Sequence, residues 1–161
     1  MKFDHNTDNF IIICYFERSM IKMKISARNQ LKGVVKSVTE GAVNGIVSIE
    51  IADGKQISAT ISMSSIKELG LAEGKEAYAI IKSTEVMIAD GAQKISARNQ
   101  LNGKVTAVEP GVVNGIVKVE IAPGVVVSST ISMNAIKELG VEAGKEVTAV
   151  AKATSVMVGI A

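Results

Sequence analysis

The sequence of 161 residues lacks most of the side chains that catalysis and metal binding normally require. It contains one histidine, His5, one cysteine, Cys14, and no tryptophan. His5 and Cys14 both lie within residues 1–22, so the rest of the chain has neither residue type. Catalysis by a Ser-His or Cys-His pair is therefore excluded there, as are zinc or iron sites with nitrogen and sulfur ligands. We expect a protein that is not an enzyme, and one cysteine allows no internal disulfide.

The sequence also lacks a long apolar run and a strong charge imbalance. Its longest strongly apolar run, FIIICYF at 10–16, is far shorter than the ~20 residues that span a bilayer. No export signal is recognised, because the start MKFDHNTDNF carries two acidic residues. A formal net charge of +2 does not indicate nucleic acid or a membrane as a partner. These features favour a cytoplasmic location.

What the chain does contain is an internal repeat. The phrase KISARNQL occurs at 24–31 and again, letter for letter, at 94–101. Residues 24–91 align with 94–161 without a gap and are identical at more than half of the positions. Two copies with so long a period do not make a solenoid. We therefore expect two small domains, 23–89 and 94–161, joined by a linker at 90–93.

Residues 1–22 lie outside the repeat and differ from it in composition. They contain four of the five aromatic residues, and the first repeat opens with its own methionine, Met23. We interpret this extension as a translated upstream region or a loosely ordered tail. The alternative is a genuine extra strand, with FIIICYF pairing on a sheet edge.

Each repeat carries the pattern of short strands. IVSIEI at 46–51 and QISATIS at 56–62 alternate apolar and polar residues, which is typical of half-buried strands. KEAYAIIK at 75–82 and STEVMI at 83–88 are expected to be the last two strands. Before them, residues 62–70 predict a brief helix that Ser62 caps and Gly70 ends.

The pattern therefore predicts an all-β fold with one short helix per repeat. Five or six strands in so few residues favour a small Greek-key barrel of the OB type. Such a core is marginal alone, and VVVSSTI at 125–131 has apolar side chains on both faces. We infer buried interfaces between the two copies and between chains.

Hydrogen-bond donors recur at equivalent positions in both repeats. They are Ser26, Arg28, Asn29, Gln30, Thr60, Ser62, Lys82 and Thr84, repeated as Ser96, Arg98, Asn99, Gln100, Thr130, Ser132, Lys152 and Thr154. A pocket of donors without acceptors favours an anion that carries no proton, such as sulfate, molybdate or tungstate. The alternative is structural: Arg28 pairs with a surface glutamate, and Ser26 is an ordinary strand-edge residue.

Several stretches resemble one known family. MKISARNQLKG, GAVNGIVSIEI, TISMSSIKELGL and EGKEAYAIIKSTEVMI are similar to the molbindins, or Mop (molybdenum-pterin-binding) proteins, in their tandem di-Mop form. The resemblance covers almost all of 23–161. It implies two OB-like TOBE/Mop barrels per chain and a trimer of two-domain chains. It also implies molybdate or tungstate bound at interfaces between domains and subunits, for molybdenum storage or homeostasis.

The resemblance also implies which residues hold the anion. They are Ser26, Ala27, Arg28, Lys82 and Ser83 in the first repeat, and Ser96, Ala97, Arg98, Lys152 and Ala153 in the second, with Thr60 and Thr130 as weaker candidates. Ala27 and Ala97 would contribute backbone N–H groups. Ala153 departs from the pattern, because it replaces the hydroxyl of Ser83 with a methyl group. KISARNQL would then be both an interface strand and an anion clamp. The competing explanation for its two identical copies is recent duplication.

Three other functions compete with an oxyanion store. A regulatory ligand-sensing module would dock to a partner protein, whereas a store would hold several anions per oligomer. A purely structural oligomer would have an idle pocket. Binding of a pterin would need an aromatic stacking surface, and beyond residue 22 the only aromatic residue is Tyr78.

Overall fold

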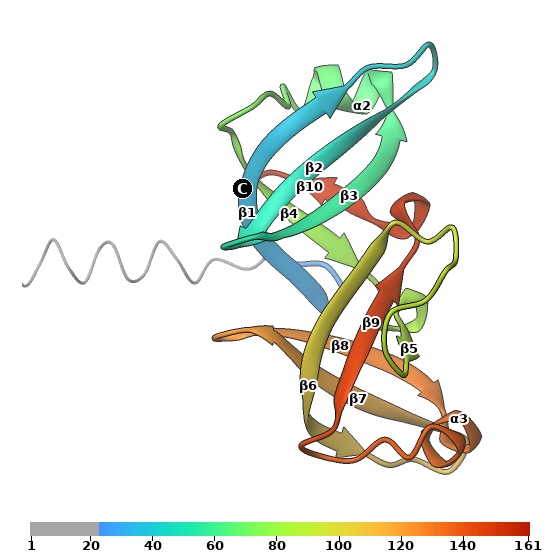
Figure 1. Ribbon diagram of the computed structural model, residues 1–161. Coiled ribbons are helices and arrows are strands. Elements are labelled where there is room, and N and C mark those ends of the chain that lie inside the picture. Colours follow the sequence, from blue (N-terminus) through green and yellow to red (C-terminus); the bar gives the residue numbers. More distant parts are fainter. Residues whose placement is uncertain (1–22) are drawn as a thin grey trace, which may run out of the picture.

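The computed structural model describes residues 23–161, which form two five-stranded antiparallel sheets, each curled into a small body. The two bodies are stacked one above the other (Figure 1). The first repeat supplies β1 (Asn29–Thr39), β2 (Asn44–Ala52), β3 (Lys55–Ser62), α2 (Met63–Glu68), β4 (Glu76–Ile81), the 3-10 turn η1 (Ser83–Glu85) and β5 (Met87–Ala89). The second supplies β6 (Asn99–Glu109), β7 (Asn114–Ala122), β8 (Val125–Ser132), α3 (Met133–Glu138), β9 (Glu146–Ala151), η2 (Ala153–Ser155) and β10 (Met157–Gly159). The hypotheses about residues 1–22 lie outside the described residues.

The alternating segments form the strands that they predict. In β2, Val47 and Ile49 are fully buried, whereas Ser48 between them is half-buried. In the helix, the Ser62 hydroxyl accepts a hydrogen bond from the Ser65 backbone N–H at 3.1 Å. Gly70 follows the helix in the left-handed conformation, with φ of 59°. The all-β architecture with a short helix in each repeat is confirmed.

Two segments differ from the expected strands. KISARNQL was expected to be an interface strand, but only its last three residues belong to β1, which begins at Asn29, and residues 24–28 are irregular. STEVMI was also expected to be one strand, but its first three residues form η1 and the strand begins at Met87. The turn is closed by a hydrogen bond from the Glu85 N–H to the Lys82 carbonyl at 2.9 Å. It redirects the chain away from its own sheet.

Each repeat gives its last strand to the other repeat's sheet. The strand order is β10-β4-β1-β2-β3 in one sheet and β5-β9-β6-β7-β8 in the other. Met87 of β5 lies opposite Val150 of β9, and Met157 of β10 lies opposite Ile80 of β4. Figure 1 shows both exchanged strands. The ranges 23–89 and 94–161 remain a prediction about domains, and neither sheet is built from one range alone.

The core continues from one sheet into the other. One cluster of buried side chains includes Val47 and Ile49 of the first repeat and Val117 and Val119 of the second. The expected buried interface between the two copies is therefore confirmed. Within residues 23–161, no helix is long and apolar enough to cross a membrane.

Two buried asparagines join the repeats by hydrogen bonds. The Asn29 side chain donates to the Ser128 carbonyl at 2.8 Å and accepts from the Ser128 N–H at 2.7 Å. Asn99 makes the same pair of bonds to Ser58, at 2.9 and 2.8 Å. Both amides are nearly inaccessible to water. Since buried polar groups are costly unless paired, these amides fix the relative position of the repeats.

We expect Asn29→Ala to lower the free energy of unfolding by about 2–4 kcal/mol, because it leaves both backbone groups of Ser128 unpaired. Asn99→Ala should have an effect of similar size through Ser58. Urea denaturation at one fixed protein concentration measures the change. Asn44→Ala, at an exposed strand start, is the matched control and should change stability by less than about 0.5 kcal/mol. Equal stability of the Asn29 and Asn44 variants would contradict a stabilising role for the hydrogen bonds between Asn29 and Ser128.

Candidate functional site

The register between β1 and β4 brings the first set of predicted ligands together. Asn29 lies opposite Ile81 in this antiparallel pair. Arg28 comes just before Asn29, and Lys82 comes just after Ile81, so both cations leave the sheet at the same end. Ser26, Ala27 and Ser83 adjoin them in the chain. We call the group Ser26, Ala27, Arg28, Lys82 and Ser83 the first site.

The second repeat builds the equivalent arrangement. Asn99 lies opposite Ala151, so Arg98 and Lys152 flank the end of the β6–β9 pair. We call the group Ser96, Ala97, Arg98, Lys152 and Ala153 the second site. Two sets of residues that are far apart in sequence thus become neighbours in each repeat because of strand register.

The cations of both sites have no acidic partner among the described residues. Arg28, Lys82, Arg98 and Lys152 are all exposed. The salt bridges found within residues 23–161 use other cations, namely Lys32, Lys36, Lys118 and Lys145. Two neighbouring positive charges repel each other, and a bound anion would relieve that repulsion. The predicted alternative, in which Arg28 pairs with a surface glutamate, is not observed.

A strand of the opposite repeat contacts the first site. The Ser83 hydroxyl lies 2.8 Å from the Thr130 hydroxyl of β8. The weaker candidate Thr130 therefore contacts a predicted ligand across the repeats. In the second site, η2 packs on β3, which carries Thr60. Ala153 has no hydroxyl there, so the equivalent hydrogen bond is missing.

The backbone around the two alanines leaves donors available. Neither the Ala27 nor the Ala97 N–H donates to a backbone acceptor within residues 23–161. Ala27 is buried against Tyr78 and Ile80, which fixes the segment on the outer face of β4. Within residues 23–161, no backbone hydrogen bond therefore occupies either N–H group.

Other recurring donors are occupied within the protein. The Asn29 and Asn99 amides bind the opposite repeat, as described above. The Gln30 side-chain amide donates to the Ala27 carbonyl at 3.2 Å, and the Gln100 amide donates to the Gln93 carbonyl at 2.9 Å. Their recurrence therefore reflects structure, whereas the recurrence of Arg28 and Lys82 has no such internal explanation.

One position that the sequence analysis did not single out is Ser129. Its hydroxyl is fully buried and donates to the Val86 carbonyl, just beyond η1. The sequence pattern could have indicated this buried position, because alternation in VVVSSTI puts Ser129 on the inward face with Val127. A polar residue on that face requires a buried partner.

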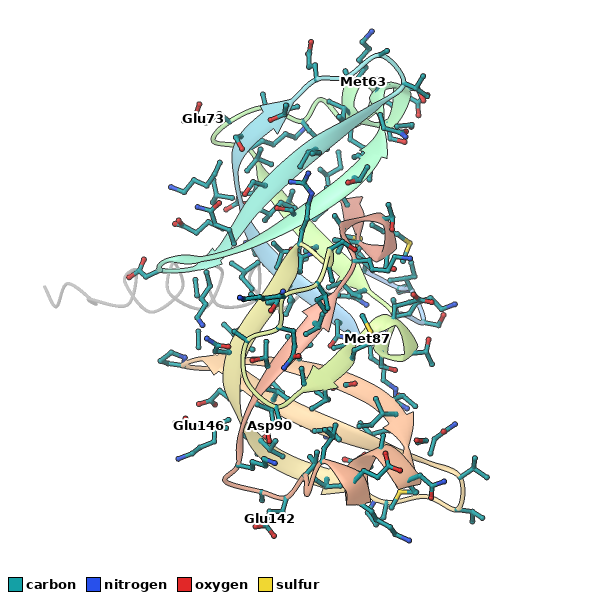
Figure 2. All side chains as sticks on the ribbon, turned by 45° about the vertical axis from the view of Figure 1, so that its right-hand side comes forward. Met63, Glu73, Met87, Asp90, Glu142 and Glu146 are labelled. Carbon is teal, nitrogen blue, oxygen red and sulfur yellow. The ribbon has the colours of Figure 1, made fainter. Side chains whose placement is uncertain are left out.

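A groove of about 730 Å³ lies away from both sites, beside the linker between the repeats. Asp90, Glu120 and Glu146 line it, together with Lys104. Figure 2 shows Asp90 and Glu146 near each other in the body formed largely by the second repeat. Three carboxylates make this groove unsuitable for an anion, and among residues 23–161 no three acidic, His or Cys side chains are arranged to hold a metal ion.

The aromatic surface that a pterin would require is covered. Tyr78 is buried in a small cluster with Ala27, Ile80 and Met23. The equivalent residue in the second repeat is Thr148, whose hydroxyl donates to the Asn102 side chain at 2.8 Å. The described residues therefore offer no open stacking surface at either position.

The TOBE domain model matches the chain twice, at residues 25–88 and 95–158. The chain is 61% identical over 66 residues to a probable molybdenum-pterin-binding protein of Haemophilus influenzae, covering 41% of this chain and 96% of that protein. It is 36% identical over 142 residues to the molybdenum-pterin-binding protein MopA of Rhodobacter capsulatus, covering 87% of this chain but only 54% of MopA. The chain thus spans about half the length of that relative.

A solved structure resembles both repeats together. The cytoplasmic molybdate-binding protein ModG, in a crystal form with molybdate bound, superimposes with a TM-score of 0.83 at 38% sequence identity. The match covers 86% of this chain and all of the ModG chain. The two relatives and the solved structure are all named as binding proteins.

Proposed function

Because the chain belongs to the TOBE-domain family of the Mop proteins, we propose that it binds molybdate, or tungstate in its place, in the cytoplasm. Its role is molybdenum storage or homeostasis, not catalysis. The observation that carries the proposal is the placement of Arg28 beside Lys82, and of Arg98 beside Lys152, at the strand ends. Among residues 23–161, none of these four cations has an acidic partner. The similarity to the molybdate-bound ModG structure supports the ligand, and the cytoplasmic description of ModG supports the location.

The donors of each site match the chemistry of a tetrahedral dianion. Arginine and lysine only donate, and so do backbone N–H groups such as that of Ala27. Each charge-assisted hydrogen bond contributes roughly 1.5–3 kcal/mol, which offsets the cost of removing water from the anion. An anion that keeps a proton, such as hydrogen phosphate, would need an acceptor that the cations cannot supply. The cations and backbone N–H groups of each site therefore favour molybdate and tungstate over hydrogen phosphate.

We expect equilibrium dialysis of the full chain against molybdate, with excess sulfate present, to retain several molybdate ions per oligomer. The double variant Arg28→Ala/Arg98→Ala should lose them, because each site then lacks its bidentate donor.

Lys32→Ala/Lys36→Ala is the control for that experiment, since it removes two surface cations that already have carboxylate partners. This control should retain molybdate at the level of the unaltered chain. Retention by the arginine variant, or no retention by the unaltered chain, would refute the proposal.

The missing hydroxyl at Ala153 should weaken the second site. We expect Ala153→Ser to strengthen binding there by about 0.5–1.5 kcal/mol, the contribution of one neutral hydrogen bond. Titration calorimetry in an Arg28→Ala background, which leaves only the second site, measures the change. Unchanged affinity would count against a contact between the anion and this position.

We also propose that three chains assemble and that the assembly covers the surface around the sites. Exposed apolar side chains support this assembly. Ile25 and Ile95 directly precede Ser26 and Ser96 of the two sites, and they are exposed. Met87 and Met157, on the exchanged strands, are exposed as well. Met87 lies between the two bodies (Figure 2). Such exposed apolar groups are typical of an interface.

Native mass spectrometry should therefore find a particle of three chains, each of 16.9 kDa. Ile25→Lys/Ile95→Lys should shift the population towards smaller species, because burying two unpaired charges opposes association. Lys24→Ala/Lys94→Ala, next to them in the chain, should leave the trimer intact. A monomeric unaltered chain would contradict this part of the proposal.

A further inference from the structure

The two turns that carry Ser83 and Ala153 are anchored differently. At the end of η1, the Val86 carbonyl accepts a hydrogen bond from the buried Ser129 hydroxyl of β8. The position of β3 that corresponds to Ser129 is Ala59, which is also fully buried. Ala59 has no hydroxyl to donate to Val156, the residue after η2. The repeats are therefore unequal at a position that no water reaches.

Three consecutive residues of β8 hold the first site. Asn29 binds the backbone of Ser128, Val86 binds the side chain of Ser129, and the Ser83 hydroxyl pairs with Thr130. Both ends of η1, together with the residue after Arg28, are thus tied to a single strand of the opposite repeat.

Fewer hydrogen bonds tie the second site to β3 than tie the first site to β8. Asn99 binds the backbone of Ser58 as Asn29 binds Ser128. The other two contacts are missing, because Ala59 and Ala153 both lack a hydroxyl. One of the three anchors of the first site is therefore retained.

We infer that Ser129 is a positioning residue for the first site and that the first site fills at lower molybdate concentration than the second. This inference rests on the proposed function. Ser129 touches no ligand itself. It holds the turn so that Ser83 and Lys82 are in place before the anion arrives, and less conformational freedom is then lost on binding. The turn of the second site is formed as well, but with fewer anchors it has more conformational freedom to lose when the anion binds.

Titration calorimetry with molybdate tests this inference in chains that keep one site each. Arg98→Ala leaves the first site, and Arg28→Ala leaves the second. In the Arg98→Ala chain, adding Ser129→Ala should raise the dissociation constant about three- to tenfold, the loss that one hydrogen bond produces. In the Arg28→Ala chain, the same change should leave the dissociation constant within about twofold. Equal effects on both sites, or no effect on the first, would overturn the inference.

A second measurement needs no molybdate. Ser129→Ala should speed hydrogen exchange of the Glu85 and Val86 amides about three- to tenfold, because η1 opens more often. The amides of Ser155, the last residue of η2, and of Val156, the residue after it, should not change. Uniform acceleration of both turns would mean general destabilisation and would overturn the inference.

The reciprocal change, Ala59→Ser, is the matched variant. It should slow exchange of the Ser155 and Val156 amides, because the new hydroxyl is placed to donate to the Val156 carbonyl as Ser129 donates to that of Val86. If neither one-site chain binds molybdate, the proposed function fails. Hydrogen exchange of the Glu85 and Val86 amides then still decides whether Ser129 holds the turn η1.

Discussion

The arrangement of both sites depends on the buried pairing of an asparagine amide with the backbone of the opposite repeat. Asn29 and Asn99 each exchange two hydrogen bonds with a strand residue of the other repeat, away from water. Each asparagine directly follows the arginine of a site. The bonds that hold the repeats together therefore also fix the point from which Arg28 or Arg98 extends. A buried amide tolerates little displacement, since every lost bond leaves an unpaired polar group.

Because the repeats exchange strands, each site depends on the opposite repeat in the same way. After Lys82 and η1, the chain crosses to the other sheet, where β5 pairs with β9. After Lys152 and η2, it crosses back, where β10 pairs with β4. Neither repeat can complete its sheet without the other. Duplication has thus produced one structural unit with two related sites, and differences such as Ser129 and Ala59 make those sites unequal without changing the fold.

Much of this fold could be predicted from local patterns. The alternation of apolar and polar residues predicts β2 and β3, because one face of each strand is buried. Ser62 predicts the start of α2, because its hydroxyl can cap the helix, and Gly70 predicts its end, because glycine adopts the left-handed conformation. The exchange could not be predicted, because β5 and β10 have three residues each, too few to specify a partner. Recurring donors could be identified from the sequence as a class. Residue type alone does not reveal that Asn29 binds the opposite repeat whereas Arg28 has no partner among residues 23–161. The grouping of Arg28 with Lys82 came from the family resemblance, and the Asn29–Ile81 register now supplies its physical reason.

We propose above all that an oxyanion lies between the arginine and the lysine at each strand end. Anomalous diffraction from crystals of the full chain grown with molybdate, recorded at the molybdenum absorption edge, tests it most directly. The account predicts a molybdenum peak beside Arg28 and Lys82, and another beside Arg98 and Lys152. Peaks elsewhere, for example in the groove lined by Asp90 and Glu146, or no peaks at all, would contradict it.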